Sequence, residues 1–324
     1  MDKILLTIAL FMVNLCSPAR SVDQAQDSVR MQEFPDSLKE AIKAEIRQEI
    51  VDEVLDQIRM DHPEAPRVPE SVTFAGKPVR FDTDDLYERM DRELIAFTYM
   101  HSNSTLMLKR SERIFAQVVP ILKANGIPED LKYLMAIESN LDPKALSSAG
   151  AAGLWQFMKA SAIQYGLEIS TDVDERYNIV KETEAACKYL KDIYRKYPDW
   201  MTVAACYNAG PGGVGRRLES QKQTTSMTLY LPEETSRYMF RILAAKVFFE
   251  NPAEFGYQLT EEDYYPYRQP EKTLTVDYEI PSLVDFAIEN GVTYRDLRKA
   301  NLWLVGTRLS NPSKKTYKII IPAR

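Results

Sequence analysis

The chain is poor in the side chains that most metal and nucleophile chemistry needs. Its 324 residues include two histidines, His62 and His101, and three cysteines, Cys16, Cys187 and Cys206. Two histidines are too few for an ordinary zinc site or for serine-hydrolase chemistry built around a Ser-His pair. Cys187 and Cys206 fall in helical-looking segments, where a buried free thiol is the ordinary state, and their redox state is left open. We therefore expect no metal and no cofactor.

An excess of basic residues is also missing. The formal net charge at pH 7 is -6, with 41 lysines and arginines against 47 acidic residues. Proteins that bind nucleic acid hold the phosphates with clustered basic side chains, so no nucleic-acid partner is expected. The hydrophobic content of 45% is ordinary for a globular protein, and the length allows one sizeable core with a smaller second domain.

The apolar run at the start of the chain, residues 4–16, is too short to cross a bilayer. Ser17 and Ala19 follow it with the spacing of a signal-peptidase site, which predicts a signal peptide over 1–19 and an exported protein. Cys16 allows an alternative, a lipidated cysteine, although the leucine before it is bulkier than such sites prefer. A lipid anchor of this kind would bring the protein to a membrane.

Residues 37–60, "SLKEAIKAEIRQEIVDEVLDQIRM", place apolar side chains four apart. This spacing predicts an amphipathic helix with a charged opposite face. Packing on the protein's own body is the favoured interpretation, and a partner helix or a membrane surface are the alternatives. The stretch "DHPEAPRVPES" then breaks the chain with three prolines, so 20–71 is interpreted as this helix and a linker.

Two regions with different patterns make up the rest of the chain. Residues 72–255 show helical periodicity interrupted by short turns, among them "NAGPGG" at 208–213, and predict a mainly α domain. A connector rich in tyrosine and proline occupies 256–271. In 272–324 the order is strand "TLTVDYEI", helices "PSLVDFAIENG" and "TYRDLRKAN", and strand "KTYKIIIP". These segments predict a small β-α-α-β domain.

Glu138 is the candidate for acid–base chemistry. It comes at the end of an apolar helical segment that starts near Leu131, within "AIESNLDPKALSSAGAAGLWQFM" at 136–158. Burial and the negative end of the helix dipole both raise the pKa of a carboxyl in that position. The dipole contributes only about 0.3–1 kcal/mol, so burial must cause most of a large rise. A carboxyl that stays protonated near neutral pH can act as a general acid, whereas an exposed glutamate at a helix end is the alternative. Asp142, before Pro143, is interpreted as a turn former.

Three motifs occur in a fixed order: "ESNLDPKALSSAGAAGLWQFM", "AACYNAG" and "EETSRYMFRI". Together they resemble the successive signatures of the lytic transglycosylase (SLT) domain, most closely those of the membrane-bound lytic murein transglycosylase D type. This resemblance implies a lysozyme-like helical fold for 72–255. It also implies export to the periplasm and a substrate, the glycan strands of bacterial peptidoglycan.

The resemblance assigns roles by position. Glu138 would be the catalytic acid and base. The residues that it implies in substrate binding are Ser147, Gln156, Met158, Tyr207, Asn208 and Tyr238, of which Tyr238 would hydrogen-bond the glutamate. Two positions depart from the common pattern, Cys206 in place of alanine and Trp155 in place of methionine. Trp155 is either a platform for sugar stacking or a core residue, and Asn208 is either a substrate contact or a turn former before "GPGG".

The family activity explains why one carboxyl suffices. Glycosidases normally use two, whereas a lytic transglycosylase lets the C6 hydroxyl of N-acetylmuramic acid (MurNAc) attack its own C1. The β-1,4 bond to N-acetylglucosamine (GlcNAc) breaks without water, and a 1,6-anhydro end forms. A hydrolytic, lysozyme-type muramidase and a non-catalytic peptidoglycan-binding protein are the alternatives.

The 272–324 region resembles a LysM domain, a module that binds glycans containing GlcNAc. The sequence "DYEIPS" replaces the Gly-Asp-Thr turn expected after the first strand, so the resemblance supports the fold more than glycan binding. A packing role for this domain is the alternative to glycan capture. The oligomeric state is left open.

Overall fold

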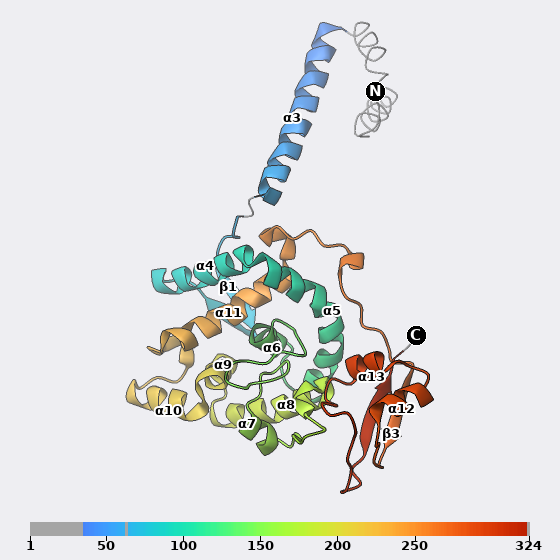
Figure 1. Ribbon diagram of the computed structural model, residues 1–324. Helices are drawn as coiled ribbons and strands as arrows, with labels where there is room; N and C mark the ends of the chain where they lie inside the picture. Colours follow the sequence, from blue (N-terminus) through green and yellow to red (C-terminus); the bar gives the residue numbers. More distant parts are fainter. Residues whose placement is uncertain (1–34, 62–63, 323–324) are drawn as a thin grey trace, which may run out of the picture. The chain divides into compact units, whose positions relative to one another are not determined.

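The computed structural model describes residues 35–61 and 64–322 (Figure 1). The chain divides into two compact units, 1–62 and 63–324. The described part of the first unit is a single helix, α3, Asp36–Asp61. The predicted signal peptide, with Cys16, lies outside the described residues. Among the helices of 35–61 and 64–322, none is both long and apolar enough to cross a membrane.

Helix α3 lies where the sequence predicts a helix, but the amphipathic interpretation is wrong. Successive residues of an α-helix turn by about 100°, so positions four apart are displaced by about 40° around the axis. An apolar row with a constant spacing of four therefore winds around α3 and does not stay on one face. Ile50 and Val51 are 54% and 42% exposed. A stable apolar face needs spacings of three and four in alternation, whereas the row of isoleucines in α3 keeps a spacing of four from Ile42 to Ile50.

The second unit is mainly helical, as predicted, and its helices pack around a hydrophobic core that extends from Val72 to Tyr257. Helix α6 occupies the centre of this helical domain, where it contacts α5 and α11 (Figure 1). The helices are α4 Asp84–Tyr99, α5 His101–Ala124, α6 Leu131–Ser139, α7 Lys159–Gln164, α8 Ile179–Lys196, α9 Trp200–Ala209, α10 Pro211–Ser220 and α11 Glu233–Glu250.

A β-hairpin that the sequence interpretation overlooked precedes the helices. Strands β1, Ser71–Phe74, and β2, Lys77–Arg80, pair antiparallel. The turn residues Ala75 and Gly76 have positive φ values of 50° and 79°, as a tight two-residue hairpin turn requires. The amide of Ala75 donates a hydrogen bond to Asp130, just before α6, at 2.7 Å. The hairpin is thereby attached to the central helix.

The segment "NAGPGG" interrupts the helices less than predicted. Gly210, with a φ of 78°, makes the whole break between α9 and α10. Pro211 begins α10, where its missing N–H leaves no hydrogen bond unmade. Asn208 lies inside α9, so the interpretation of Asn208 as a turn former is wrong.

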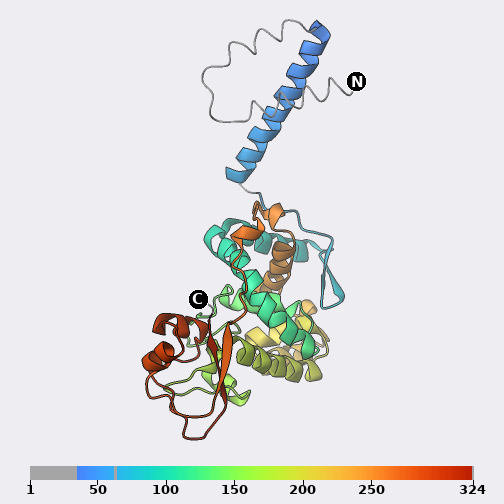
Figure 2. The same ribbon diagram turned by 90° about the vertical axis from the view of Figure 1, so that its right-hand side faces the viewer.

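The C-terminal domain has the predicted order, with strand β3 Lys272–Val276, helices α12 Leu283–Glu289 and α13 Tyr294–Ala300, and strand β4 Tyr317–Ile321. The two strands pair antiparallel, with Val276 opposite Tyr317. Alternate residues of β4 are buried, because successive side chains of a strand point to opposite faces. Figure 2 shows this domain beside the segment between α7 and α8 of the helical domain. Its hydrophobic core includes Val173 from that segment.

Candidate active site

Glu138 lies in the last turn of α6, as the sequence predicts. The helix ends because Asn140 and Leu141 adopt the left-handed conformation, with φ values of 51° and 53°. Asparagine takes this conformation more readily than most residues, and it ends many helices in this way. The preceding residues of α6 are mostly buried, so the carboxyl group stands at the end of an apolar helix.

The Glu138 carboxyl is held by a neighbour from α11. The Tyr238 hydroxyl donates a hydrogen bond to Oε1 of Glu138 at 2.6 Å. Burial raises the pKa of Glu138; the hydrogen bond from Tyr238 acts against this rise, and the negative charge of Glu234 adds to it. The pKa is raised overall, which favours a protonated carboxyl. Glu234 is exposed, one helical turn before Tyr238, and the spacing of four in "EETSRY" is the signal that could have identified it.

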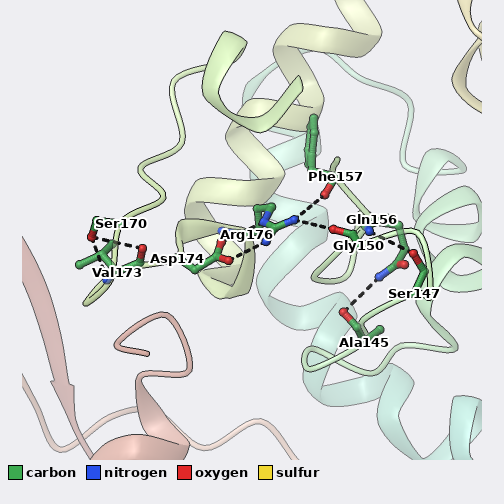
Figure 3. A network of polar contacts seen from close by, with 10 residues as sticks. Ala145, Ser147, Gly150, Gln156, Phe157, Ser170, Val173, Asp174 and Arg176 are labelled. Atoms are coloured by element: carbon green, nitrogen blue, oxygen red, sulfur yellow. Dashed lines mark hydrogen bonds and ion pairs between the residues drawn. The ribbon is translucent and has the colours of Figure 1, made fainter. Parts of the chain in front are cut away.

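Ser147 and Gln156 lie on one loop, 145–157 (Figure 3). The Ser147 hydroxyl accepts a hydrogen bond from the amide of Ala151 at 3.0 Å. Gln156 has a φ of 49°, and its side-chain amide donates to the carbonyls of Ala145 at 3.2 Å and Gly153 at 2.8 Å. The loop is thus closed on itself by its own polar side chains.

Trp155 is a core residue, and its interpretation as a sugar platform is wrong. Its side chain has no exposed surface, and its indole N–H donates to Thr183 on α8 at 3.0 Å. The Tyr207 hydroxyl donates to the backbone carbonyl of Trp155 at 2.6 Å. Burial raises the pKa of Tyr207 well above its ordinary value, and the charge of Glu138 adds to the rise. Tyr207 is therefore near enough to Glu138 to be affected by its charge.

The remaining predicted residues lie at the surface of the same region. Met158, at the start of α7, is 47% exposed, and Asn208 is partly exposed in the last turn of α9. The structure joins Glu138 to Tyr238 directly and brings Tyr207 into electrostatic contact with them. The roles of all these residues towards a substrate stay predictions.

Glu182, on α8, was not predicted. It has no exposed surface; its Oε2 accepts the amide N–H of Trp155 at 3.2 Å, and its Oε1 has no hydrogen-bond partner in the described part of the chain. Burial raises the pKa of Glu182 well above its ordinary value. Glu182 shares the apolar face of its helix with Ala186 and Leu190, and a charged residue on such a face is the signal in the sequence. A Cβ on Gly153, whose φ is 83°, would overlap this carboxylate.

Arg176 contacts the loop 145–157 through its guanidinium group. Its guanidinium group forms a two-point ion pair with Asp174, at 3.0 and 2.7 Å. The same group donates to the carbonyls of Gly150 at 2.8 Å and Phe157 at 3.2 Å (Figure 3). A planar guanidinium group can serve several acceptors at once, which makes this contact specific to arginine.

The sequence predicts no metal site and leaves the redox state of Cys187 and Cys206 open. No group of three or more His, Cys, Asp or Glu side chains in 35–61 and 64–322 is placed to hold a metal ion. Cys187 and Cys206 are buried free thiols. Burial raises their pKa values to about 11 and about 12, so both stay protonated and unreactive.

Comparison with known proteins identifies two domain families in the chain. Residues 121–229 match the transglycosylase SLT domain family, and residues 272–324 match the family of soluble lytic transglycosylase C-terminal LysM-like domains. The chain therefore carries an SLT transglycosylase domain followed by a LysM-like domain. It is homologous to the membrane-bound lytic murein transglycosylase D of Escherichia coli strain K12, with 29% identity over 187 residues. That alignment covers 56% of this chain and 40% of the relative.

One further curated protein and one solved structure match parts of the chain. The peptidoglycan transglycosylase gp16 of Escherichia phage T7 is 34% identical over 124 residues, which cover 37% of this chain and 9% of the phage protein. The solved structure of the 70 kDa soluble lytic transglycosylase of Escherichia coli aligns with 76% of this chain and 52% of its own, at 13% identity and a TM-score of 0.38. A structural likeness of that size supports no conclusion by itself.

Proposed function

We propose that this protein is a peptidoglycan lytic transglycosylase that cleaves the MurNAc–GlcNAc β-1,4 bond without water. The observation that carries the proposal is Glu138 itself. It is a carboxyl with a raised pKa at the end of the central helix of an SLT domain, and Tyr238 holds it in place. Such a group can give a proton to a leaving oxygen and take one back later.

The reaction balances with this one carboxyl. Protonated Glu138 gives its proton to the glycosidic oxygen as the bond to C1 of MurNAc breaks. The resulting carboxylate then takes the proton of the C6 hydroxyl while that oxygen bonds to C1. The product is a 1,6-anhydro end, and Glu138 is protonated again. Attack from within the same sugar has a large entropic advantage, up to about 7–11 kcal/mol in well-oriented systems.

The loop 145–157 and α9 would line the glycan groove, and the structure restricts what each group can offer. Both amide hydrogens of Gln156 are directed to backbone carbonyls, so its side-chain oxygen is the group that would meet a sugar hydroxyl. The Tyr207 hydroxyl donates its hydrogen to Trp155, so it would only accept from a substrate. The residues that we propose in substrate binding remain Ser147, Gln156, Met158, Tyr207, Asn208 and Tyr238.

A hydrolytic muramidase is the second candidate, and Glu234 is the observation that favours it. Its negative charge reaches Glu138, and an exposed second carboxylate near the acid could activate a water molecule. The two candidates share the substrate and the role of Glu138. They differ in whether water or the C6 oxygen attacks C1.

We also propose that the protein is exported through the signal peptide at 1–19 and acts in the periplasm on peptidoglycan strands. Membrane association would come from a lipid on Cys16 or from the 37–60 helix. The winding distribution of apolar residues on α3 gives the helix no single face for a membrane surface, which favours the lipid. The homology to a relative named as membrane-bound agrees with either route.

Product analysis on purified sacculi tests the proposal. Wild-type protein should release muropeptides whose ends are lighter by one water than reducing ends, as mass spectrometry detects. Glu138→Gln should release none while still sedimenting with sacculi. Asp142→Asn is the matched control. Its carboxylate belongs to the same segment but accepts from the Lys144 amide and from Arg110, so activity should persist. Reducing ends would establish the hydrolase instead, and lysis by Glu138→Gln would remove Glu138 from the mechanism.

A further inference from the structure

The LysM-like domain is joined to the helical domain through backbone pairing. The amide of Asp174 donates to the carbonyl of Trp303 at 2.8 Å, and the carbonyl of Asp172 accepts from the amide of Val305 at 2.9 Å. Val173, between them, forms an antiparallel bridge with Leu304. The helical domain thus adds a short strand-like segment to the LysM-like domain.

Side chains complete this contact. Val173 is 1% exposed and belongs to the hydrophobic core of the LysM-like domain, not to that of its own domain. The carboxylate of Asp172 accepts the amide of Ser310 at 3.0 Å, and Glu168 accepts the hydroxyl of Tyr317 at 3.0 Å. A module tethered only by a flexible linker would not share its core with its neighbour. The LysM-like domain is therefore docked.

The segment 168–176, which contacts the LysM-like domain, is connected to the loop 145–157 of the candidate active site by hydrogen bonds. The amide of Asp174 donates to the carbonyl of Trp303, and the carboxylate of Asp174 pairs with Arg176. Arg176 in turn donates to the backbone carbonyls of Gly150 and Phe157 in the loop 145–157 (Figure 3). One residue, Asp174, therefore belongs to both the domain contact and the support of the loop.

We propose that the LysM-like domain is a positioning element for the active site, which it supports through Asp174 and Arg176. This inference rests on the proposed function. Docking fixes the segment 168–176, and Arg176 then holds the loop 145–157 in the geometry that a glycan meets. Undocking would leave Arg176 paired with Asp174 but would free both to move, and the loop would lose its fixed donor. Misplacement by about 1 Å in a catalytic site can reduce the rate by about a hundredfold.

A glycan-capture role predicts something different. Capture by the LysM-like domain would strengthen binding to long polymers but would leave turnover of a short, soluble GlcNAc–MurNAc oligomer unchanged. A positioning role predicts a loss of kcat on that same short substrate, with little change in KM. The short oligomer therefore distinguishes the two roles.

Val173→Glu in the full-length protein is the first variant to test. A buried, unpaired carboxylate in the core of the LysM-like domain disfavours docking. We expect kcat on the short oligomer to fall about ten- to a hundredfold, and hydrogen exchange to accelerate at the amides of Ala152 and Phe157, which bond to each other in the loop. Ile288→Glu adds the same charge at a position of the LysM-like domain that is 68% exposed, and should behave as wild type.

Arg176→Lys is the second variant, which keeps the result interpretable if Val173→Glu fails to fold. Lysine keeps the positive charge near Asp174 but lacks the planar group that reaches both carbonyls. We expect kcat to fall and the loop amides to exchange faster, while the amides of Ile280 and Leu309 inside the LysM-like domain stay protected. Unchanged kcat in Arg176→Lys, or in a Val173→Glu protein that is folded and undocked, would overturn the inference. Inactive wild-type protein on the oligomer would instead count against the proposed function.

Discussion

Replacing Tyr238 by phenylalanine should shift the pH dependence of the reaction upwards. The phenol donates to Oε1 of Glu138 at 2.6 Å, and this bond stabilises the ionised carboxylate. Burial, together with the charge of Glu138, raises the pKa of Tyr238 well above its ordinary value, so the phenol stays protonated and the bond persists at every working pH. Tyr238→Phe keeps the buried ring and removes only the donor.

The size of the effect follows from the strength of such a bond. A hydrogen bond to a charged group contributes about 1.5–3 kcal/mol. Glu138 is only partly buried, so water would replace some of the lost interaction and the lower end applies. A change of about 1.4 kcal/mol alters an equilibrium constant tenfold. The acid dissociation constant of Glu138 should therefore fall about tenfold, which means a higher pKa.

The assay is the pH profile of kcat/KM on a short soluble glycan oligomer, because kcat/KM reports the ionisation of the free enzyme. Glu138 must start protonated, so activity declines as pH rises through its pKa. In Tyr238→Phe this decline should begin at a higher pH. Tyr230→Phe is the matched control, since Tyr230 is 87% exposed, and its profile should match that of wild type. An alkaline limb that stays in place, or moves to lower pH, would refute the role given to Tyr238.

Two further predictions concern the support of the loop. Gly153→Ala should lower the free energy of unfolding by more than Gly76→Ala. Both glycines have positive φ, which costs alanine about 1–3 kcal/mol of strain. Only at Gly153 would the new Cβ also overlap Arg176 and Glu182. Equal losses of unfolding free energy in urea would contradict the close approach of Gly153 to Arg176 and Glu182. Relative to wild type, Glu182→Gln should become more stable as pH rises above about 4.5. The pKa of Glu182 is higher in the native than in the unfolded state, so the wild type loses stability between these two pKa values. A stability difference that is constant with pH would show that Glu182 does not titrate in this way.

The sequence determined the parts of this protein that depend on neighbouring residues. The apolar positions of α6, the left-handed residue at its end and the placement of Glu138 in its last turn are local features. The β-α-α-β order of the C-terminal domain is also local, because turn residues and side-chain alternation mark each element. The order of the three motifs indicates the SLT domain without any knowledge of tertiary contacts.

Tertiary structure decided which groups meet. Tyr238 hydrogen-bonds Glu138 across 100 positions of the chain; the family resemblance implied this contact, but no local pattern of residues predicts a pair so far apart. Glu182 lies on the apolar face of α8, but only the fold shows that it accepts a hydrogen bond from the backbone of Trp155. The burial of Trp155 and the docking of the LysM-like domain on Val173 likewise depend on surfaces that only packing brings together. Local sequence determines where the helices and strands form. The pKa of Glu138 and the support of the loop 145–157 depend instead on contacts between segments that are distant in the sequence.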